Sequence, residues 1–105
     1  MEIDDYQRQT CLTAHCPVAY LSGQLGTFPL YEALGLAGEV GEVLEIIKKS
    51  CRGDNPEITE INRRALELEL GDVLWYLAQL AEKLGLDLNM VALANLSKLR
   101  TRYGV

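Results

Sequence analysis

Two pairs of acidic residues lie inside the most apolar stretches of the chain. Glu39 and Glu42 form the first pair, and Glu69 and Asp72 form the second. Within each pair the residues are three positions apart, a spacing that places both carboxylates on one face of a helix. Carboxylates are rarely buried unless they are paired or bound to a cation. A fold that packs these two helix faces together therefore needs a counter-charge for four carboxylates.

Helical periodicity runs through most of the sequence, whereas the alternating runs typical of strands are short. We expect four helices, at about residues 3–13, 30–51, 57–84 and 88–102. Their ends carry turn and cap signals: Gly53 after the second helix, Asn55 and Pro56 before the third, Gly85 after the third and Asp87 before the fourth. Because short connections favour antiparallel neighbours, the sequence predicts a single all-α domain over residues 1–105 that resembles a four-helix bundle.

Bulk properties exclude several classes of protein. The 105 residues suffice for one domain with one core. The sequence has no run of about 18 uncharged apolar residues, so no membrane span is expected. The acidic N-terminus lacks the basic and apolar regions of a signal peptide, and we expect a cytoplasmic protein. A net charge of −5 argues against a nucleic acid polymer as partner, and without the four paired acids the balance is 11 acids against 10 bases.

The three cysteines are interpreted as free thiols in a reducing compartment, because their number is odd and no secretion signal precedes them. Cys11, Cys16 and Cys51 are each expected to be small buried side chains. A zinc site made by these cysteines and His15 is disfavoured, since the chain lacks a Cys-x2-Cys spacing and His15 adjoins Cys16.

The helical positions of the acids place them in apolar stripes. At about 100° per residue, the two members of each pair are about 60° apart, and most of their neighbours on that face are apolar. A single pair with this spacing is usually a solvated surface feature, but two pairs in apolar stripes of adjacent helices favour a shared site. Residues 30–47 and 65–81 contain no Lys or Arg, so a cationic side chain would have to come from elsewhere.

Three glycines accompany the acids. Gly38 directly precedes the first pair, Gly41 lies within it, and Gly71 lies within the second. Each lowers the stability of a helix by about 1 kcal/mol relative to Ala. Close approach of the helices or room for a ligand would explain their presence.

The ligand chemistry of the four acids favours a hard divalent cation. Carboxylate oxygens suit Mg²⁺, with Mn²⁺ as an alternative. A di-iron centre is disfavoured because such bundles add Glu-x-x-His motifs, and His15, the one histidine, has no Glu three residues before it. Mg²⁺ held by carboxylates commonly completes its shell with water and substrate phosphates, which indicates phosphate chemistry.

Three segments of the chain resemble the motifs of a known family. The segments from Leu34 to Glu42, from Glu69 to Leu77 and from Ala94 to Tyr103 are similar to those of the MazG-like all-α nucleoside triphosphate pyrophosphohydrolases. The resemblance extends from Leu30 to Tyr103, and the first thirty residues carry little of it.

The resemblance implies a reaction and a metal site. Glu39, Glu42, Glu69 and Asp72 would hold one or more Mg²⁺ ions, and nucleoside or deoxynucleoside triphosphates would be cleaved between the α and β phosphates. The products would be a nucleoside monophosphate and pyrophosphate, in a reaction that removes unwanted nucleotides. Glu39 or Glu42 would act as general base on the attacking water. Two alternatives stay open: a pyrophosphohydrolase acting on a substrate such as phosphoribosyl-ATP, and a non-catalytic helical oligomer that binds metal.

Polar residues of the last helix are candidates for substrate binding. Asn95, Lys98 and Arg102 fall at i, i+3 and i+7 and so share one face, whereas Arg100 points elsewhere. Cations on that face can stabilise charge on a phosphoryl group, and the resemblance favours the phosphate role for Asn95 and Lys98. The competing interpretation is a solvated basic helix end that complements the helix dipole.

Aromatic residues near the acids are candidates for the nucleoside. Tyr76 lies one turn beyond Asp72 on the same face, where it would stack on a base or sugar or else belong to the core. Phe28 and Tyr31 flank the start of the second helix and are expected to border the base pocket.

The second helix is apolar nearly all round, which bears on assembly. In a monomer of this size one face of such a helix would stay exposed, so self-association is expected. The family resemblance implies a homodimer or a homotetramer with active sites near the subunit interfaces.

Overall fold

The computed structural model describes residues 1–14 and 28–105, and within these ranges the chain is helical with no strand. The elements are α1 (Ile3–Thr10), the short 3-10 helix η1 (Cys11–Thr13), α3 (Leu30–Ser50), α4 (Glu60–Lys83) and α5 (Leu88–Tyr103). The all-α prediction is therefore confirmed. His15 and Cys16 fall outside the described residues. None of the described helices combines the length and the hydropathy needed to cross a bilayer.

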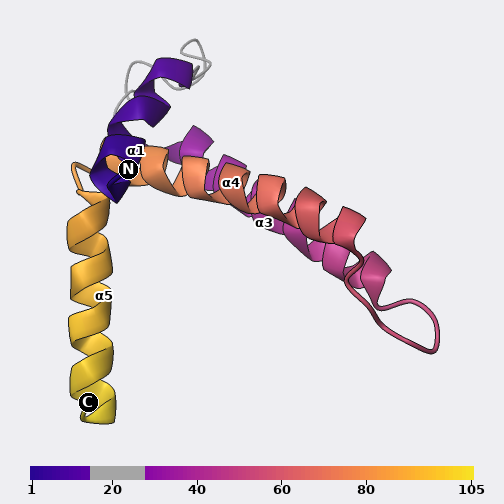
Figure 1. Cartoon of the computed structure of the whole chain (residues 1–105). Coiled ribbons are helices and arrows are strands. Elements are labelled where there is room, and N and C mark those ends of the chain that lie inside the picture. The colour runs from indigo at the N-terminus through magenta and orange to yellow at the C-terminus, as the bar shows by residue number, and fades with distance from the viewer. Residues whose placement is uncertain (15–27) are drawn as a thin grey trace.

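The helices of one chain are arranged as a hairpin with two further helices at one end (Figure 1). α3 and α4 lie side by side along most of their length, and α1 crosses the end of α4. α5 contacts α1 and extends away from the α3–α4 hairpin. The buried apolar residues of the described chain are Ala78, Ala81 and Leu88, with Ile3 and Tyr6 packed against them. The core of a single chain is thus small and lies where α1, α4 and α5 meet.

Gln7 of α1 fixes this junction. Its side chain is buried, and its Nε2 donates to the backbone oxygen of Leu86 at 2.8 Å and to Oε2 of Glu82 at 3.2 Å. Its Oε1 accepts a hydrogen bond from the backbone N–H of Leu88 at 2.8 Å. One amide therefore holds the first residue of α5 against α1, and this contact sets the position from which α5 departs.

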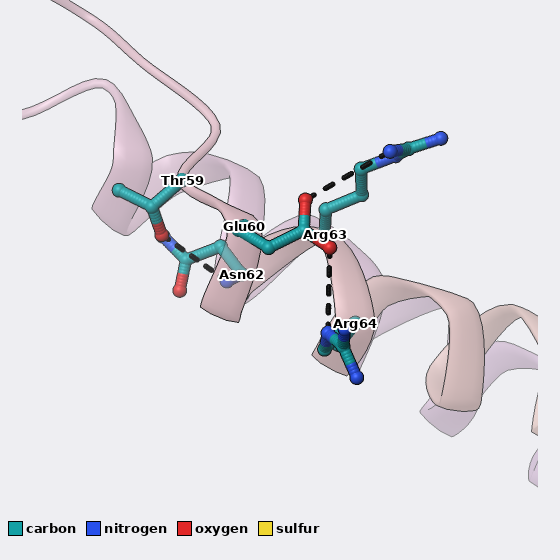
Figure 2. A network of polar contacts seen from close by, with 5 residues as sticks. All are labelled: Thr59, Glu60, Asn62, Arg63 and Arg64. Atoms are coloured by element: carbon teal, nitrogen blue, oxygen red, sulfur yellow. Dashed lines mark hydrogen bonds and ion pairs between the residues drawn. The ribbon is translucent and has the colours of Figure 1, made fainter.

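The start of α4 differs from the prediction. The helix begins at Glu60, and its N-cap is Thr59, whose Oγ1 accepts a hydrogen bond from the backbone N–H of Asn62 at 3.1 Å (Figure 2). Capping by Asn55 with Pro56 in the first helical position is therefore wrong. A Thr hydroxyl is an effective cap, and it lies nearer the first periodic apolar residue of this helix.

Glu60 also forms ion pairs within the first turn of α4. Its carboxylate lies 3.3 Å from Nε of Arg64 and 3.8 Å from Arg63, and Figure 2 shows the two guanidinium groups on either side of it. All three side chains are exposed, so each pair is worth about 0.3–0.5 kcal/mol. The two helices are joined at this end by Asn62, whose Nδ2 donates to Oγ of Ser50 at 3.1 Å.

The predicted signals around α5 are confirmed. Gly85 has a φ of +69° directly after α4, and the bonds from its N–H to Glu82 and from the N–H of Leu86 to Ala81 close a Schellman motif. Asp87 caps α5 by accepting from the backbone N–H groups of Asn89 and Met90. Gly53 plays a different part from the one predicted, because α3 ends at Ser50 and Gly53 takes its positive φ only later in the following loop.

The two described cysteines are free and exposed thiols, Cys11 in η1 and Cys51 directly after α3. The expectation that they are buried is wrong, because both follow the end of a helix where the chain turns into a loop or a short 3-10 turn.

Candidate active site

Three carboxylates converge where α3 faces α4. Ligand oxygens of Glu39 from α3 and of Glu69 and Asp72 from α4 all lie within 4.8 Å of one another. The spacing of three within α4 places its two acids on the side that faces α3, and the hairpin supplies the third. These three residues, called the acid cluster below, bring together one acid from the first predicted pair and both from the second.

The electrostatics of the acid cluster fit a bound cation. Desolvation raises the pKa of Glu39 above its ordinary value, and the charge of Asp72 and a hydrogen bond with Glu69 raise it further. In the described parts of the chain, every ion pair of Lys or Arg is made with acids outside the cluster. Crowded oxygen ligands without a counter-charge are the donor set that Mg²⁺ and Mn²⁺ prefer.

The fourth predicted ligand, Glu42, lies beside the cluster and not within it. It is exposed, and its charge contributes to the raised pKa of Glu39. Asp72 is exposed as well, whereas Glu39 and Glu69 are half-buried. The expectation that all four acids are buried on packing faces is therefore wrong for a single chain, because one neighbouring helix covers only part of each stripe.

Tyr76 sits in the seam between α3 and α4 next to the acid cluster. Its ring packs directly on Gly35, where no side chain intervenes, and its centroid lies 6.2 Å from that of Tyr31. A hydrogen bond with Tyr31, desolvation and the charges of Glu39 and Asp72 raise the pKa of Tyr76 to about 12. The phenol is thus neutral at physiological pH and lies beside the carboxylates. This position is compatible with both roles predicted for Tyr76, stacking on a base or sugar and packing in the core.

Tyr6 is a neighbour of the site that the sequence did not reveal. Its hydroxyl donates a long hydrogen bond, 3.5 Å, to the backbone oxygen of Gly71. Burial raises the pKa of Tyr6, and the charge of Asp72 adds to this effect. The feature of the sequence that could have indicated this position is the spacing of Ile3 and Tyr6, which turns both side chains toward the core.

One chain does not bring the predicted residues of α5 to the acid cluster. Asn95, Lys98 and Arg102 are exposed on a helix that projects away from the α3–α4 hairpin (Figure 1). Among the described residues neither Lys98 nor Arg102 forms an ion pair. Phe28 is also exposed, two residues before the start of α3.

The fold and the acid cluster together define an all-α domain with a candidate divalent-cation site. Residues 30–104 match the MazG nucleotide pyrophosphohydrolase domain, and the chain belongs to this family. The match contains the acid cluster, Glu42, Tyr76 and the whole of α5.

Individual proteins are similar over different extents. Gene 37 protein of Mycobacterium phage L5 is 41% identical over 102 residues, which cover 97% of this chain and 89% of that protein. The dCTP pyrophosphatase 1 of Rattus norvegicus is 39% identical over 74 residues, and that of Homo sapiens is 39% identical over 72 residues. These stretches cover 69% and 67% of this chain, but 44% and 42% of the mammalian enzymes. The chain thus matches less than half the length of those two relatives.

Proposed function

We propose that this protein is a Mg²⁺-dependent nucleoside triphosphate pyrophosphohydrolase that removes unwanted nucleotides in the cytoplasm. Family membership supports the reaction class. The observation that carries the proposal is the convergence of Glu39, Glu69 and Asp72, with ligand oxygens within 4.8 Å of one another.

The acids have distinct roles in this proposal. Glu39, Glu69 and Asp72 would hold Mg²⁺, which when bound neutralises phosphate charge and makes water more acidic. Glu42 lies beside these ligands and accepts the proton of the attacking water as general base. Water adds to the α-phosphorus, the bond from that phosphorus to the α–β bridging oxygen breaks, and pyrophosphate leaves with this oxygen. The other product is the nucleoside monophosphate.

Self-association is part of the proposal. The described helices leave many large apolar side chains open to solvent, more than a folded monomer usually exposes in one patch. Apolar side chains such as Leu44, Leu68 and Leu93 are at least half exposed. We therefore propose a homodimer or homotetramer in which the face of α5 that carries Lys98 approaches the acid cluster of a second copy.

A substrate panel tests the function. Each common nucleoside and deoxynucleoside triphosphate, with phosphoribosyl-ATP as a further member, is incubated with Mg²⁺, and pyrophosphate is measured against orthophosphate. The name of the mammalian relatives makes dCTP the first compound to test. We expect pyrophosphate from at least one triphosphate, loss of turnover by orders of magnitude in Asp72→Ala, and unchanged helix content in that variant. A preference for phosphoribosyl-ATP would support the related enzyme class, and no pyrophosphate from any compound would support a non-catalytic oligomer.

A further inference from the structure

Glu32 is a buried carboxylate that the proposed reaction does not use. Its residue is only 4% exposed, and Oε2 accepts no hydrogen bond from the residues that the structure describes. Burying a carboxylate oxygen without a donor is unfavourable. Such a group is therefore expected to meet a donor in another state of the protein, as when a ligand is bound.

Helix capping does not account for Glu32. The residue occupies the third position of α3, from which a Glu side chain commonly reaches back to the backbone N–H of the N-cap residue. Here the N-cap is Pro29, which has no N–H, and no side-chain hydrogen bond caps this end of the helix. The positive end of the helix dipole still favours a negative charge at this position. The carboxylate is thus tolerated there, and Oε2 has no capping partner.

The position of Glu32 follows from the periodicity of α3. Glu32 and Glu39 share one face, because seven residues complete nearly two turns and advance about 10.5 Å along the helix. Between them lies Gly35, against which Tyr76 packs, and Tyr31 is paired with that tyrosine. The face of α3 that meets α4 therefore carries, in order, the acid cluster, an aromatic pair and a buried carboxylate.

This order corresponds to the parts of a nucleotide, and the correspondence rests on the function proposed above. With the phosphates at the acid cluster, a nucleoside directed toward the N-terminal end of α3 lies on the side of Tyr76 and Glu32. We infer that Glu32 is a specificity-determining residue that accepts a hydrogen bond from the exocyclic amino group of the nucleobase. An ionised carboxylate accepts hydrogen bonds and donates none. It therefore favours amino-bearing bases such as cytosine and adenine over their keto counterparts, whose oxygen is itself an acceptor.

Matched substrate pairs test this role. dCTP and dUTP differ in the amino or keto group and in the hydrogen on the adjoining ring nitrogen, as do dATP and dITP, so kcat/KM is compared within each pair for the wild type and for Glu32→Gln. We expect the wild type to prefer the amino member by at least about tenfold, and the variant to fall below about threefold, because the Gln amide can donate to a keto oxygen. Glu67→Gln changes an exposed carboxylate of α4 in the same way and should leave both ratios unchanged.

A binding measurement separates this inference from the proposed function. Affinities for dCMP and dUMP are measured by calorimetry without metal, and the wild type but not Glu32→Gln should prefer dCMP. An unchanged ratio in Glu32→Gln, together with a lower melting temperature, would mean that the carboxylate serves only the structure, and the inference would be wrong. Absence of pyrophosphate release from every triphosphate would instead overturn the proposed function, while the binding preference would still test Glu32.

Discussion

Gly35 of α3 lies directly against the ring of Tyr76 of α4. A Cβ at position 35 would overlap the ring carbons Cε1, Cδ1 and Cζ of that tyrosine. The two helices approach closely at this point, and one turn further along α3 the same approach brings Glu39 to Glu69 and Asp72. The packing of one glycine on one aromatic ring thus sets the register that assembles the acid cluster.

Gly35→Ala is therefore expected to destabilise the protein. The added methyl gains about 1 kcal/mol of helix propensity, but overlap with a half-buried ring costs about 1–3 kcal/mol and displaces Tyr76. Urea unfolding should show a lower midpoint than the wild type. Gly38→Ala is the matched control, because a Cβ there meets nothing within 4 Å in the described chain and should raise the midpoint.

A double-mutant cycle identifies the ring as the cause. If the cost of Gly35→Ala comes from overlap with Tyr76, the substitution should cost much less when residue 76 is already Ala. Equal costs in both backgrounds would show that the methyl group meets another part of the molecule.

The sequence predicted the faces of the helices but not which residues meet across them. The spacing of the acids correctly placed Glu39, Glu69 and Asp72 on facing stripes, since periodicity along one helix fixes its apolar side. Close approach of the helices or room for a ligand was expected to explain Gly38, Gly41 and Gly71. A Cβ at each meets nothing within 4 Å in the described chain, so they are not points of close approach there, and room for a ligand stays a prediction. Close approach occurs at Gly35 because register depends on how two helices slide along each other, and periodicity is unchanged by sliding.

The direction of α5 was also beyond prediction from local signals. Gly85 and Asp87 correctly indicated a short turn followed by a capped helix, and a short turn favours antiparallel packing. In the structure, the backbone of Leu86 and Leu88 is hydrogen-bonded to Gln7, about eighty positions earlier in the chain. Local sequence patterns span only a few turns of helix and therefore do not predict a contact between residues so far apart in the chain.

Substitutions among the acids should separate metal binding from proton transfer. Asp72→Asn removes a carboxylate of the cluster and is expected to weaken Mg²⁺ binding and turnover together. Glu42→Gln changes a carboxylate beside the cluster, so it should lower turnover by about 100-fold or more while Mg²⁺ affinity changes by less than about threefold. Isothermal calorimetry with Mg²⁺ gives the affinities. Equal loss of Mg²⁺ affinity in both variants would instead make Glu42 a fourth ligand.

The raised pKa of Glu39 predicts a pH dependence of stability in metal-free buffer. A carboxyl whose pKa is higher in the folded state stabilises the fold only while it is protonated, so this contribution is complete below about pH 4.5 and is lost as pH rises through the raised value. Glu39→Gln stays neutral throughout. In EDTA the variant should match the wild type below pH 4.5 and exceed its melting temperature above the raised pKa.

At neutral pH, excess Mg²⁺ should make the melting temperature of the wild type higher than that of Glu39→Gln. A cation in the acid cluster favours the ionised carboxylate and binds only the folded state, so the melting temperature of the wild type rises with Mg²⁺ concentration. Glu39→Gln lacks one ligand oxygen charge and should respond less. A wild-type melting temperature that does not change at millimolar Mg²⁺ would contradict a preformed cation site.

Two cationic residues of α5, Lys98 and Arg100, allow a matched test of substrate binding. Lys98 shares a helix face with Asn95 and Arg102, whereas Arg100 is on the opposite side, and all are exposed. Lys98→Ala should raise KM for the preferred triphosphate by about tenfold if the Lys98 ammonium contacts its phosphates. Arg100→Ala removes the same charge from the same helix and should leave KM within about twofold. Equal effects would indicate a general attraction between the helix and the anion.

Self-association should depend on the apolar side of α5. Leu93 is 51% exposed on α5, and a large apolar side chain left open in one chain is expected to be covered by another copy. Leu93→Glu would bury a charge in that interface and should shift the protein from oligomer to monomer in sedimentation velocity at micromolar concentration. Asn55→Glu adds the same charge to the exposed loop between α3 and α4 and should leave the oligomer intact.

Because the residues of α5 are proposed to act on the acid cluster of another copy, the monomeric variant should also lose turnover while retaining Mg²⁺ binding. An oligomer that persists in Leu93→Glu would mean that the copies associate through the α3–α4 hairpin instead.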